Sequence, residues 1–416
     1  MLKDRSHREN LFCIVAILIT LVIPPTLDIH IFGVQPATLI WLILFVIFIF
    51  GSKIKNDFRG VKLALVIALI ITLSAVMSNT TQQFMLGGVV PFFGICIAII
   101  LFVPAINKKS NLNLCIKVIL LFSVLEFFMA SYQYTTKSWP LFDEINQAEF
   151  TSQAFFGRVS GTFGHPIVYG TFAGFCSLLA LKYGGKFKYY LFFINLIGLF
   201  ISGSRSGLFP LAAILIYIEY WNLIKIIKRQ TILIRRVWIT VMIITLIFLA
   251  IPFFIYNNGD LDLSRYLNLT QSISYQYRIQ QWQAGLSLIT ENYTTILIGY
   301  GPGSTVELFS TRRLIDLWGP QTFDNAYVTL AFEYGIIGAL LIFILIIASS
   351  INIKSDNNVF ILYLVLNAIF FDAHRWPIYI VLFSIAVALC DVSLIKYNDI
   401  KSNVDRPETI GGKYII

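Results

Sequence analysis

Long apolar runs recur along the whole of this 416-residue chain and constrain its fold more than any other feature. A lipid hydrocarbon core takes about 20 apolar residues of α-helix to cross, and its backbone polar groups must be satisfied within the segment. Such runs occupy residues 11–27, 31–50, 61–77, 86–106, 112–131, 165–181, 189–201, 207–220, 237–256, 326–349, 359–371 and 377–395. The sequence therefore predicts an all-α polytopic membrane protein of about twelve transmembrane helices.

Composition supports lipid as the solvent and argues against other classes of protein. Charged residues make up 13% of the chain, about half the share of a soluble domain. The net charge of +9 comes from short basic clusters between apolar runs rather than from one basic face, which argues against nucleic-acid binding. Lys3, Arg5 and Arg8 precede the first run as in a signal peptide, but Pro24 follows it without a small-residue cleavage site. We interpret this run as a first helix.

The cysteines indicate neither a disulfide framework nor a metal site. All five lie within or at the ends of apolar runs, at spacings that fit no metal-binding motif. We therefore expect no cofactor.

The distribution of Lys and Arg predicts the orientation. With the N-terminus inside, the cytoplasmic side holds 23 of the 31 basic residues, as the positive-inside rule requires. Both termini are then cytoplasmic. The predicted organisation is nine helices in residues 1–256, an extracytoplasmic loop in 257–325, three helices in 326–395 and a cytoplasmic tail in 396–416.

The large outer loop is too long for a plain connection. It contains an amphipathic stretch, with Ile279, Trp282, Leu286 and Ile289 at helical spacing. We interpret the loop as a folded cap on the helix bundle.

Basic residues predicted on the outer side are almost all arginine. An isolated outer arginine is equally well explained by an ion pair or a snorkelling side chain. Several of them in glycine-rich junctions favour a site for an anionic, membrane-embedded ligand, because the guanidinium binds phosphate in a bidentate way. The outer set is Lys137, Arg158, Arg205, Arg265, Arg278, Arg312, Arg313 and Arg375.

Two junctions carry this pattern. Arg158 precedes the sequence Val-Ser-Gly-Thr-Phe-Gly-His-Pro, in which His165 and Pro166 open a helix. Arg205 lies in Ser-Gly-Ser-Arg-Ser-Gly at 202–207, a polar turn that opens another helix. Backbone N–H groups at a helix start favour phosphate, although a plain reverse turn also explains the second junction.

Acidic residues near these junctions are candidates for proton transfer. Asp324 enters the tenth span, and is either a general base or a helix N-cap. Glu333 lies two turns into that span, and Glu126 lies in the fifth; an intramembrane carboxylate is a functional candidate. Asp260 and Asp262 form a short Asp-x-Asp pair that nothing beside it completes, so we predict no metal site.

Histidine and tryptophan complete the candidate set. His165 and His374 are both predicted outside, where either could be a base or a phosphate contact; a surface turn also explains His374. Trp282 offers a flat face for a sugar ring, or anchors the chain at the membrane interface.

The order and spacing of these motifs resemble the O-antigen ligase and polymerase superfamily over roughly residues 157–340. The matching elements are Arg158 with the following glycine-rich turn, the 202–207 turn, Arg278 with Trp282, the Gly-Tyr-Gly-Pro-Gly of 299–303, and the Asp324-Asn325 to Glu333 segment.

The resemblance implies a glycan transfer on the outer face of a bacterial inner membrane. The implied donor is an undecaprenyl-pyrophosphate-linked oligosaccharide, used without nucleotide sugar or metal, and a chain-length regulator is an implied partner. Arg158, Arg205 and Arg278 match arginines that imply pyrophosphate recognition, and His165, Trp282, Asn325 and Glu333 are expected to bind substrate. Many members carry His-Asn where this chain has Asp324-Asn325, so Asp324, His374 or His165 remain alternatives for the base.

These expectations favour a polymerase of O-antigen, capsule or exopolysaccharide repeat units. The alternatives are a ligase that passes glycan to lipid A core and a flippase for lipid-linked oligosaccharides. A flippase would place its polar groups at the bilayer midplane and keep short loops, which this sequence does not.

Overall fold

The computed structural model describes residues 103–106, 109–138, 158–227, 273–310, 323–350 and 356–404, together with scattered positions between 15 and 96. Every regular element in this part of the chain is a helix, so the predicted all-α class is confirmed there. The elements are α5 (Val103–Ile106), α6 (Lys109–Thr136), η2 (Gly161–Phe163), α8 (Pro166–Tyr183), η3 (Gly185–Phe187), α9 (Lys188–Ile201), α10 (Arg205–Ile227), α13 (Ile273–Thr290), α14 (Tyr293–Ile298), α15 (Ser304–Ser310), α16 (Ala326–Ser350), α17 (Asn358–Asn367), η4 (Ala373–Arg375) and α18 (Pro377–Val404).

Local capping explains where predicted and observed helix ends differ. The predicted span at 207–220 begins two residues earlier, at Arg205, because Ser204 caps α10 by accepting a hydrogen bond from the Gly207 N–H through its hydroxyl, at 3.4 Å. The predicted span at 359–371 ends earlier, at Asn367, where the chain turns towards η4. The spans predicted at 31–50 and 237–256 lie outside the described residues, as does almost all of 11–27.

The predicted count of twelve transmembrane helices stays a prediction. Among the described residues, Ser110–Thr136 is long and apolar enough to cross a membrane alone. Pro166–Tyr183 and Gly185–Ile201 pass the same test together, bent by 120° at their junction. Ala326–Leu340, Asn358–Asn367 and Pro377–Cys390 are shorter apolar helices.

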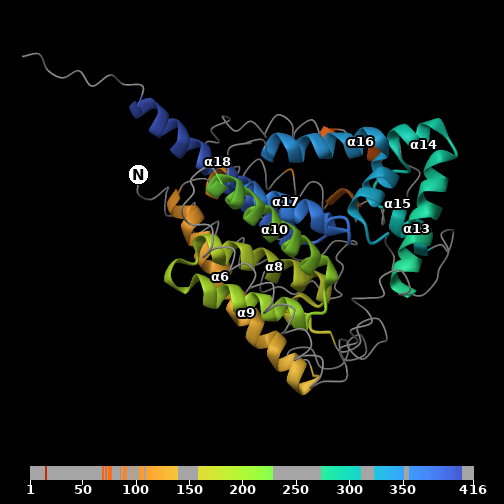
Figure 1. Ribbon diagram of the computed structural model, residues 1–416. Coiled ribbons are helices and arrows are strands. Elements are labelled where there is room, and N and C mark those ends of the chain that lie inside the picture. Colours follow the sequence, from red (N-terminus) through yellow and green to blue (C-terminus); the bar gives the residue numbers. More distant parts are fainter. Residues whose placement is uncertain are drawn as a thin grey trace, which may run out of the picture.

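Helix α8 lies at the centre of the described bundle and packs against α6, α9, α10 and α17 (Figure 1). Glycines allow its closest crossings. A Cβ on Gly170 would overlap Ser204 at the start of α10, and one on Gly174 would overlap the Tyr363 side chain of α17. Gly198 on α9 receives the Tyr169 hydroxyl in the same way. Small residues at helix crossings let backbones approach closely, the usual packing of helices in lipid.

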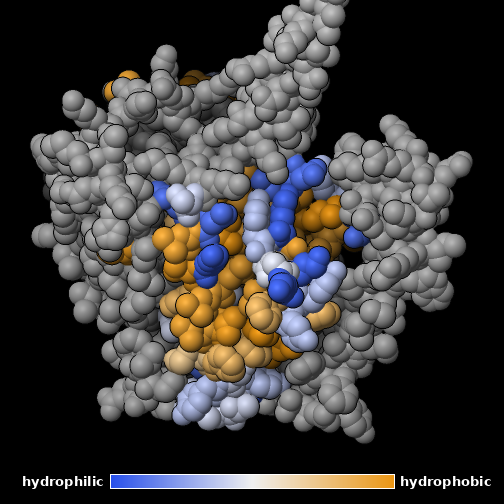
Figure 2. Space-filling model, turned by 90° about the vertical axis from the view of Figure 1, so that its left-hand side faces the viewer, coloured by the Kyte–Doolittle hydropathy of each residue, from blue (hydrophilic) through white to orange (hydrophobic). Residues whose placement is uncertain are grey.

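The outward face of α6 is apolar. Leu121, Leu125, Phe128 and Tyr132 follow one another at helical spacing and are all exposed. On the side of the molecule drawn in Figure 2, hydrophobic residues gather in one area, with hydrophilic residues beside them. Exposed apolar surface on this scale is unusual for a protein surrounded by water.

Helices α13, α14 and α15 lie together at one end of the molecule (Figure 1). They share a second hydrophobic core with the start of α16, built around Ile289, Phe309, Phe323 and Phe332. The expected apolar stripe of α13 is wrong at one position, since Leu286 is 49% exposed. The Phe323 ring packs at the Cα of Gly285 instead, where a Cβ would lie 2.6 Å from the ring, so the buried stripe runs through Gly285 and Ile289.

Helix α16 is kinked where α14 crosses it. Gly335 has φ 65° and ψ −173°, which interrupts the helix. The 299–303 segment is held there, because the N–H groups of Tyr300 and Gly301 donate to the Phe332 and Glu333 carbonyls at 2.9 Å each. This segment therefore supplies donors to carbonyls next to the kink.

We expect Gly335→Ala to lower the free energy of unfolding by about 3 kcal/mol, from the left-handed φ together with overlap between the new Cβ and the Leu297 carbonyl group. Gly185→Ala is the matched control, because Gly185 has φ 57° with no atom within 4 Å of an added Cβ. It should cost only about 1 kcal/mol. Thermal unfolding of both variants in detergent measures the difference, and equal losses would contradict the packing account.

Candidate functional site

Helix α6 fixes the segment that carries Arg158 and His165. Both oxygens of the Glu126 carboxylate accept hydrogen bonds from Thr162, one from its N–H at 2.8 Å and one from its hydroxyl at 2.5 Å. The Gln133 amide donates to the Gly161 carbonyl at 2.8 Å and accepts from the N–H groups of Ser160 and Gly161. Glu126, a functional candidate in the sequence, thus holds the turn between Arg158 and α8.

Arg158 joins the two junctions that the sequence singled out. Its Nε donates to the Ser202 carbonyl at 3.0 Å, next to Gly203, which has φ 59°. Arg205 begins α10 three residues later. The serine hydroxyls of this turn mostly bond to the turn itself, with Ser204 Oγ and Ser206 Oγ 2.8 Å apart.

His165 caps α8. Its Nδ1 accepts a hydrogen bond from the Ile167 N–H at 3.3 Å, and Pro166 follows at the first helical position. Its ring lies 5.6 Å from the Trp376 ring, centroid to centroid. Burial lowers the pKa of His165 to about 4; Arg158 and Arg278 act in the same direction and Asp324 opposes them. The imidazole is therefore neutral at pH 7.

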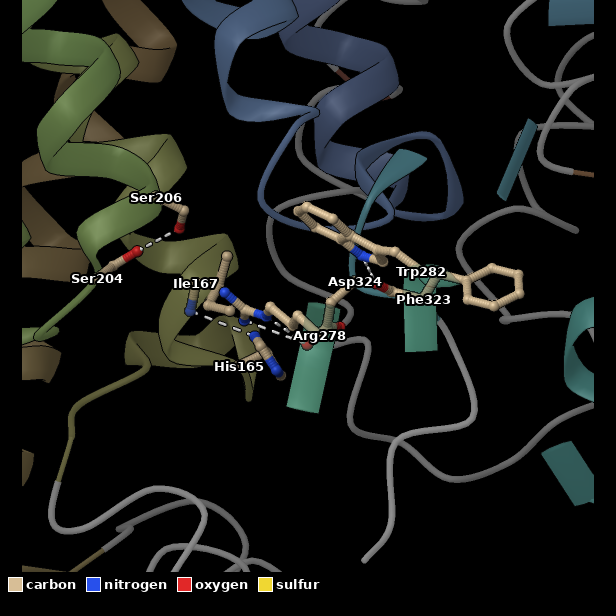
Figure 3. A network of polar contacts seen from close by, with 8 residues as sticks. All are labelled: His165, Ile167, Ser204, Ser206, Arg278, Trp282, Phe323 and Asp324. Carbon is tan, nitrogen blue, oxygen red and sulfur yellow. Dashed lines mark hydrogen bonds and ion pairs between the residues drawn. The ribbon is translucent and has the colours of Figure 1, made fainter. Parts of the chain in front are cut away.

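Arg278 on α13 and Asp324 before α16 form an ion pair in front of His165. Arg278 Nη2 and Nε lie 3.2 and 3.3 Å from the same oxygen, Asp324 Oδ2. The two side chains are 21% and 30% exposed. In Figure 3 Arg278 lies next to His165, with Ser204 and Ser206 at the adjoining start of α10.

The backbone around Asp324 is fixed on both sides. Trp282 Nε1 donates to the Phe323 carbonyl at 2.7 Å (Figure 3). Asn325 Oδ1 accepts from the N–H groups of Tyr327 at 3.0 Å and Val328 at 3.3 Å, so Asn325 caps α16. Asp324 itself has φ 49°, a conformation that Asp adopts more readily than most residues. The N-cap interpretation of Asp324 is therefore wrong, and its carboxylate is directed to Arg278.

Residues 190–343 match the family model described as O-antigen ligase. This match supports membership of the O-antigen ligase and polymerase superfamily. A comparison with curated proteins finds no match. The family consists of bacterial membrane proteins, and the match points to a glycosyltransferase-like enzyme that acts on a lipid-linked glycan.

The part that matches the superfamily contains Arg205, Arg278 and Asp324 but begins after Arg158 and His165. The structure brings these two to the matched part, because Arg158 binds the Ser202 carbonyl and His165 lies near Arg278 and Asp324.

A second, buried charge cluster lies close by. Glu333, which is fully buried, pairs with Arg375 Nη2 at 2.7 Å, and Arg375 is 16% exposed. Asp372 Oδ1 accepts from the Thr329 hydroxyl at 2.6 Å. Burial raises the pKa of the Asp372 carboxyl to about 6, opposed by Arg375. Thr329 and Glu333 lie on α16, which begins two residues after Asp324, so the second cluster adjoins the first.

Sequence reasoning placed Arg375 only among the outer arginines and did not single out Asp372. The segment Asp-Ala-His-Arg-Trp at 372–376 indicated a charge pair, because its carboxylate and guanidinium lie three residues apart across a compact turn. Glu333 was expected to bind substrate, and its side chain is instead enclosed with Arg375. The side chain of His374 and the Asp260 pair lie outside the described residues. Among those described, no group of three His, Cys, Asp or Glu side chains could hold a metal.

Proposed function

We propose that this protein polymerises lipid-linked polysaccharide repeat units of O-antigen, capsule or exopolysaccharide. It transfers the growing glycan from undecaprenyl pyrophosphate to the terminal sugar of another lipid-linked repeat. The observation that supports this is the convergence of Arg158, Arg278, His165 and Asp324 from distant segments onto one partly exposed place, in a chain of this superfamily.

The residues fit the chemistry of such a transfer. A sugar hydroxyl attacks the anomeric carbon, and the carbon–oxygen bond to pyrophosphate breaks, so negative charge grows on the leaving group. Arg158, Arg205 and Arg278 stabilise that charge, which fixed cations do best in a site of low dielectric. Asp324 takes the proton of the attacking hydroxyl.

His165 and Trp282 complete the proposed site. The neutral imidazole of His165 offers a hydrogen bond to the pyrophosphate and, because it carries no charge, does not form a second ion pair with the Asp324 carboxylate. Trp282 fixes the Phe323 carbonyl through its indole N–H and packs in part against the second hydrophobic core, and we assign the exposed part of its ring to a sugar. Glu333 supports this region through Arg375 rather than by touching substrate.

A ligase that transfers glycan to lipid A core is the second candidate. Asp324 at the position where many ligases carry histidine favours the polymerase. The polymerase and the ligase would both act on the outer face of the membrane and would both have cytoplasmic termini, as proposed here.

Arg205→Ala should remove the glycan ladder from cells that lack the native copy, because one cation of the donor site is lost. Lys186→Ala is the matched control, since Lys186 is an exposed cation in η3, away from the start of α10. We expect wild type and Lys186→Ala to restore a full ladder on a gel. Arg205→Ala should leave a single lipid-linked repeat.

The pattern on the gel also separates the candidates. In cells without the protein, a single lipid-linked repeat indicates a polymerase. A normal ladder retained on the polyprenyl carrier would indicate a ligase. The absence of any repeat on the outer face would indicate a flippase and would refute the transfer reaction.

A further inference from the structure

We propose that the Asp324 carboxylate occupies the place of the donor's pyrophosphate on Arg278 until the donor binds, and is released as the base by that binding. This inference rests on the proposed function. It assigns to Arg278 two successive partners, first Asp324 and then the pyrophosphate, and so makes proton abstraction dependent on donor binding.

The ion pair is built to be exchanged. Two of the three side-chain nitrogens of Arg278, Nη2 and Nε, approach one oxygen at 3.2 and 3.3 Å, whereas strong charge-assisted pairs are about 2.7–2.9 Å long. The Glu333–Arg375 pair of the same molecule has that shorter length, at 2.7 Å, and is buried. Because Arg278 and Asp324 are both partly exposed, their pairing is weak and open to a competing anion.

A pyrophosphate is a stronger partner for Arg278 than a single carboxylate. It carries more negative charge and several acceptor oxygens, and it reaches Arg158 and His165 at the same time. His165 lies next to Arg278 (Figure 3), and Arg158 precedes His165 by seven residues and is held on the 202–207 turn by the Ser202 carbonyl. Binding of the donor at this place therefore draws the Arg278 guanidinium away from Asp324.

Asp324 cannot follow the guanidinium, because its backbone is fixed. Trp282 holds the Phe323 carbonyl on one side and the Asn325 cap holds the start of α16 on the other. The carboxylate stays in position while its cation leaves, and loss of a neighbouring cation makes a carboxylate more basic.

In the transfer step, the acceptor hydroxyl gives its proton to Asp324, and its oxygen forms the new bond to the anomeric carbon. The bond from that carbon to the pyrophosphate oxygen breaks, and its electron pair leaves with the pyrophosphate, held by Arg278. One arginine thus restrains the base before donor binding and stabilises the leaving group afterwards.

Binding of inorganic pyrophosphate to the purified full-length protein tests the exchange. Asp324→Asn removes the competing charge while keeping the side-chain shape and a residue that accepts positive φ. We expect this variant to bind pyrophosphate roughly threefold to tenfold more tightly than wild type, while the ladder is lost in cells. Glu291→Gln is the matched control, because it removes one exposed charge of the same helical cap; its affinity should be that of wild type.

The same measurement in an Arg278→Gln background separates exchange from simple repulsion. If Asp324 competes for Arg278, the gain from Asp324→Asn disappears when Arg278 is absent. A gain that persists there, or no gain with Arg278 present, overturns the exchange and leaves the proposed function intact. A full ladder from Asp324→Asn would instead refute Asp324 as the base. Asp324→Gly, which also accepts φ 49°, repeats the test if the Asn variant does not fold.

Discussion

Arg278→Ala is expected to reduce the rate of glycan transfer at least a hundredfold. The guanidinium is paired with Asp324 and lies next to His165 (Figure 3), and we place it on the oxygen that gains charge as the pyrophosphate leaves. Loss of one fixed donor at a developing negative charge typically costs about 10²–10³ in rate. The measurement is the initial rate of polymer formation from lipid-linked repeats by membranes that contain equal amounts of each variant.

Two further variants are the controls for this result. Thr290→Ala changes an exposed residue at the far end of the same helix and should transfer at the wild-type rate. Arg278→Lys keeps the charge but replaces the planar fork by a single ammonium, so we expect an intermediate rate. An Arg278→Ala variant that forms polymer at the wild-type rate would contradict the placement of Arg278 at the leaving group.

Arg375→Ala is expected to cost about 3–5 kcal/mol of folding stability, the usual effect of leaving one partner of a buried ion pair uncompensated. Glu333 is fully buried and its Oε1 is paired with Arg375 at 2.7 Å; its Oε2 has no hydrogen-bond partner in the described structure. The abundance of the variant in membranes and its thermal midpoint in detergent measure the loss.

The double variant Glu333→Gln with Arg375→Met is the matched control. It removes both charges at once, and replacing a buried pair by uncharged side chains is often close to neutral. We therefore expect it to recover most of the stability lost by Arg375→Ala. If Arg375→Ala is as stable as wild type, the pair does not anchor α16 to the turn before α18.

The sequence was sufficient for the helices that begin and end at strong signals. Pro166 after His165 marked the start of α8, and the apolar run beginning at Ala326 marked α16, because local spacing and capping decide these ends. The kink at Gly335 was not predicted, since a glycine within an apolar run is compatible with a continuous helix. Its conformation depends on α14, which crosses α16 there.

The candidate site was predictable in residue type but not in pairing. Arg278 and Asp324 were both candidates, yet their contact spans 46 positions in the chain, and that of Glu333 with Arg375 spans 42. Periodicity carries no information over such separations. The choice between Asp324 and Asn325 as the cap of α16 was also undecidable, because both residue types cap helices and the two are adjacent.

The glycine crossings of α8 restrict how this protein can diverge. Gly170 and Gly174 leave no room for a larger side chain where α8 meets α10 and α17. A larger residue at Gly170 would displace the turn that holds Arg158, and one at Gly174 would displace Tyr363 of α17. Changes in sugar preference during evolution are then expected on the open side of α13, at positions such as Gln280 and Gln283, which are exposed. A directed-evolution library for new glycans should vary that side and leave α8 unchanged.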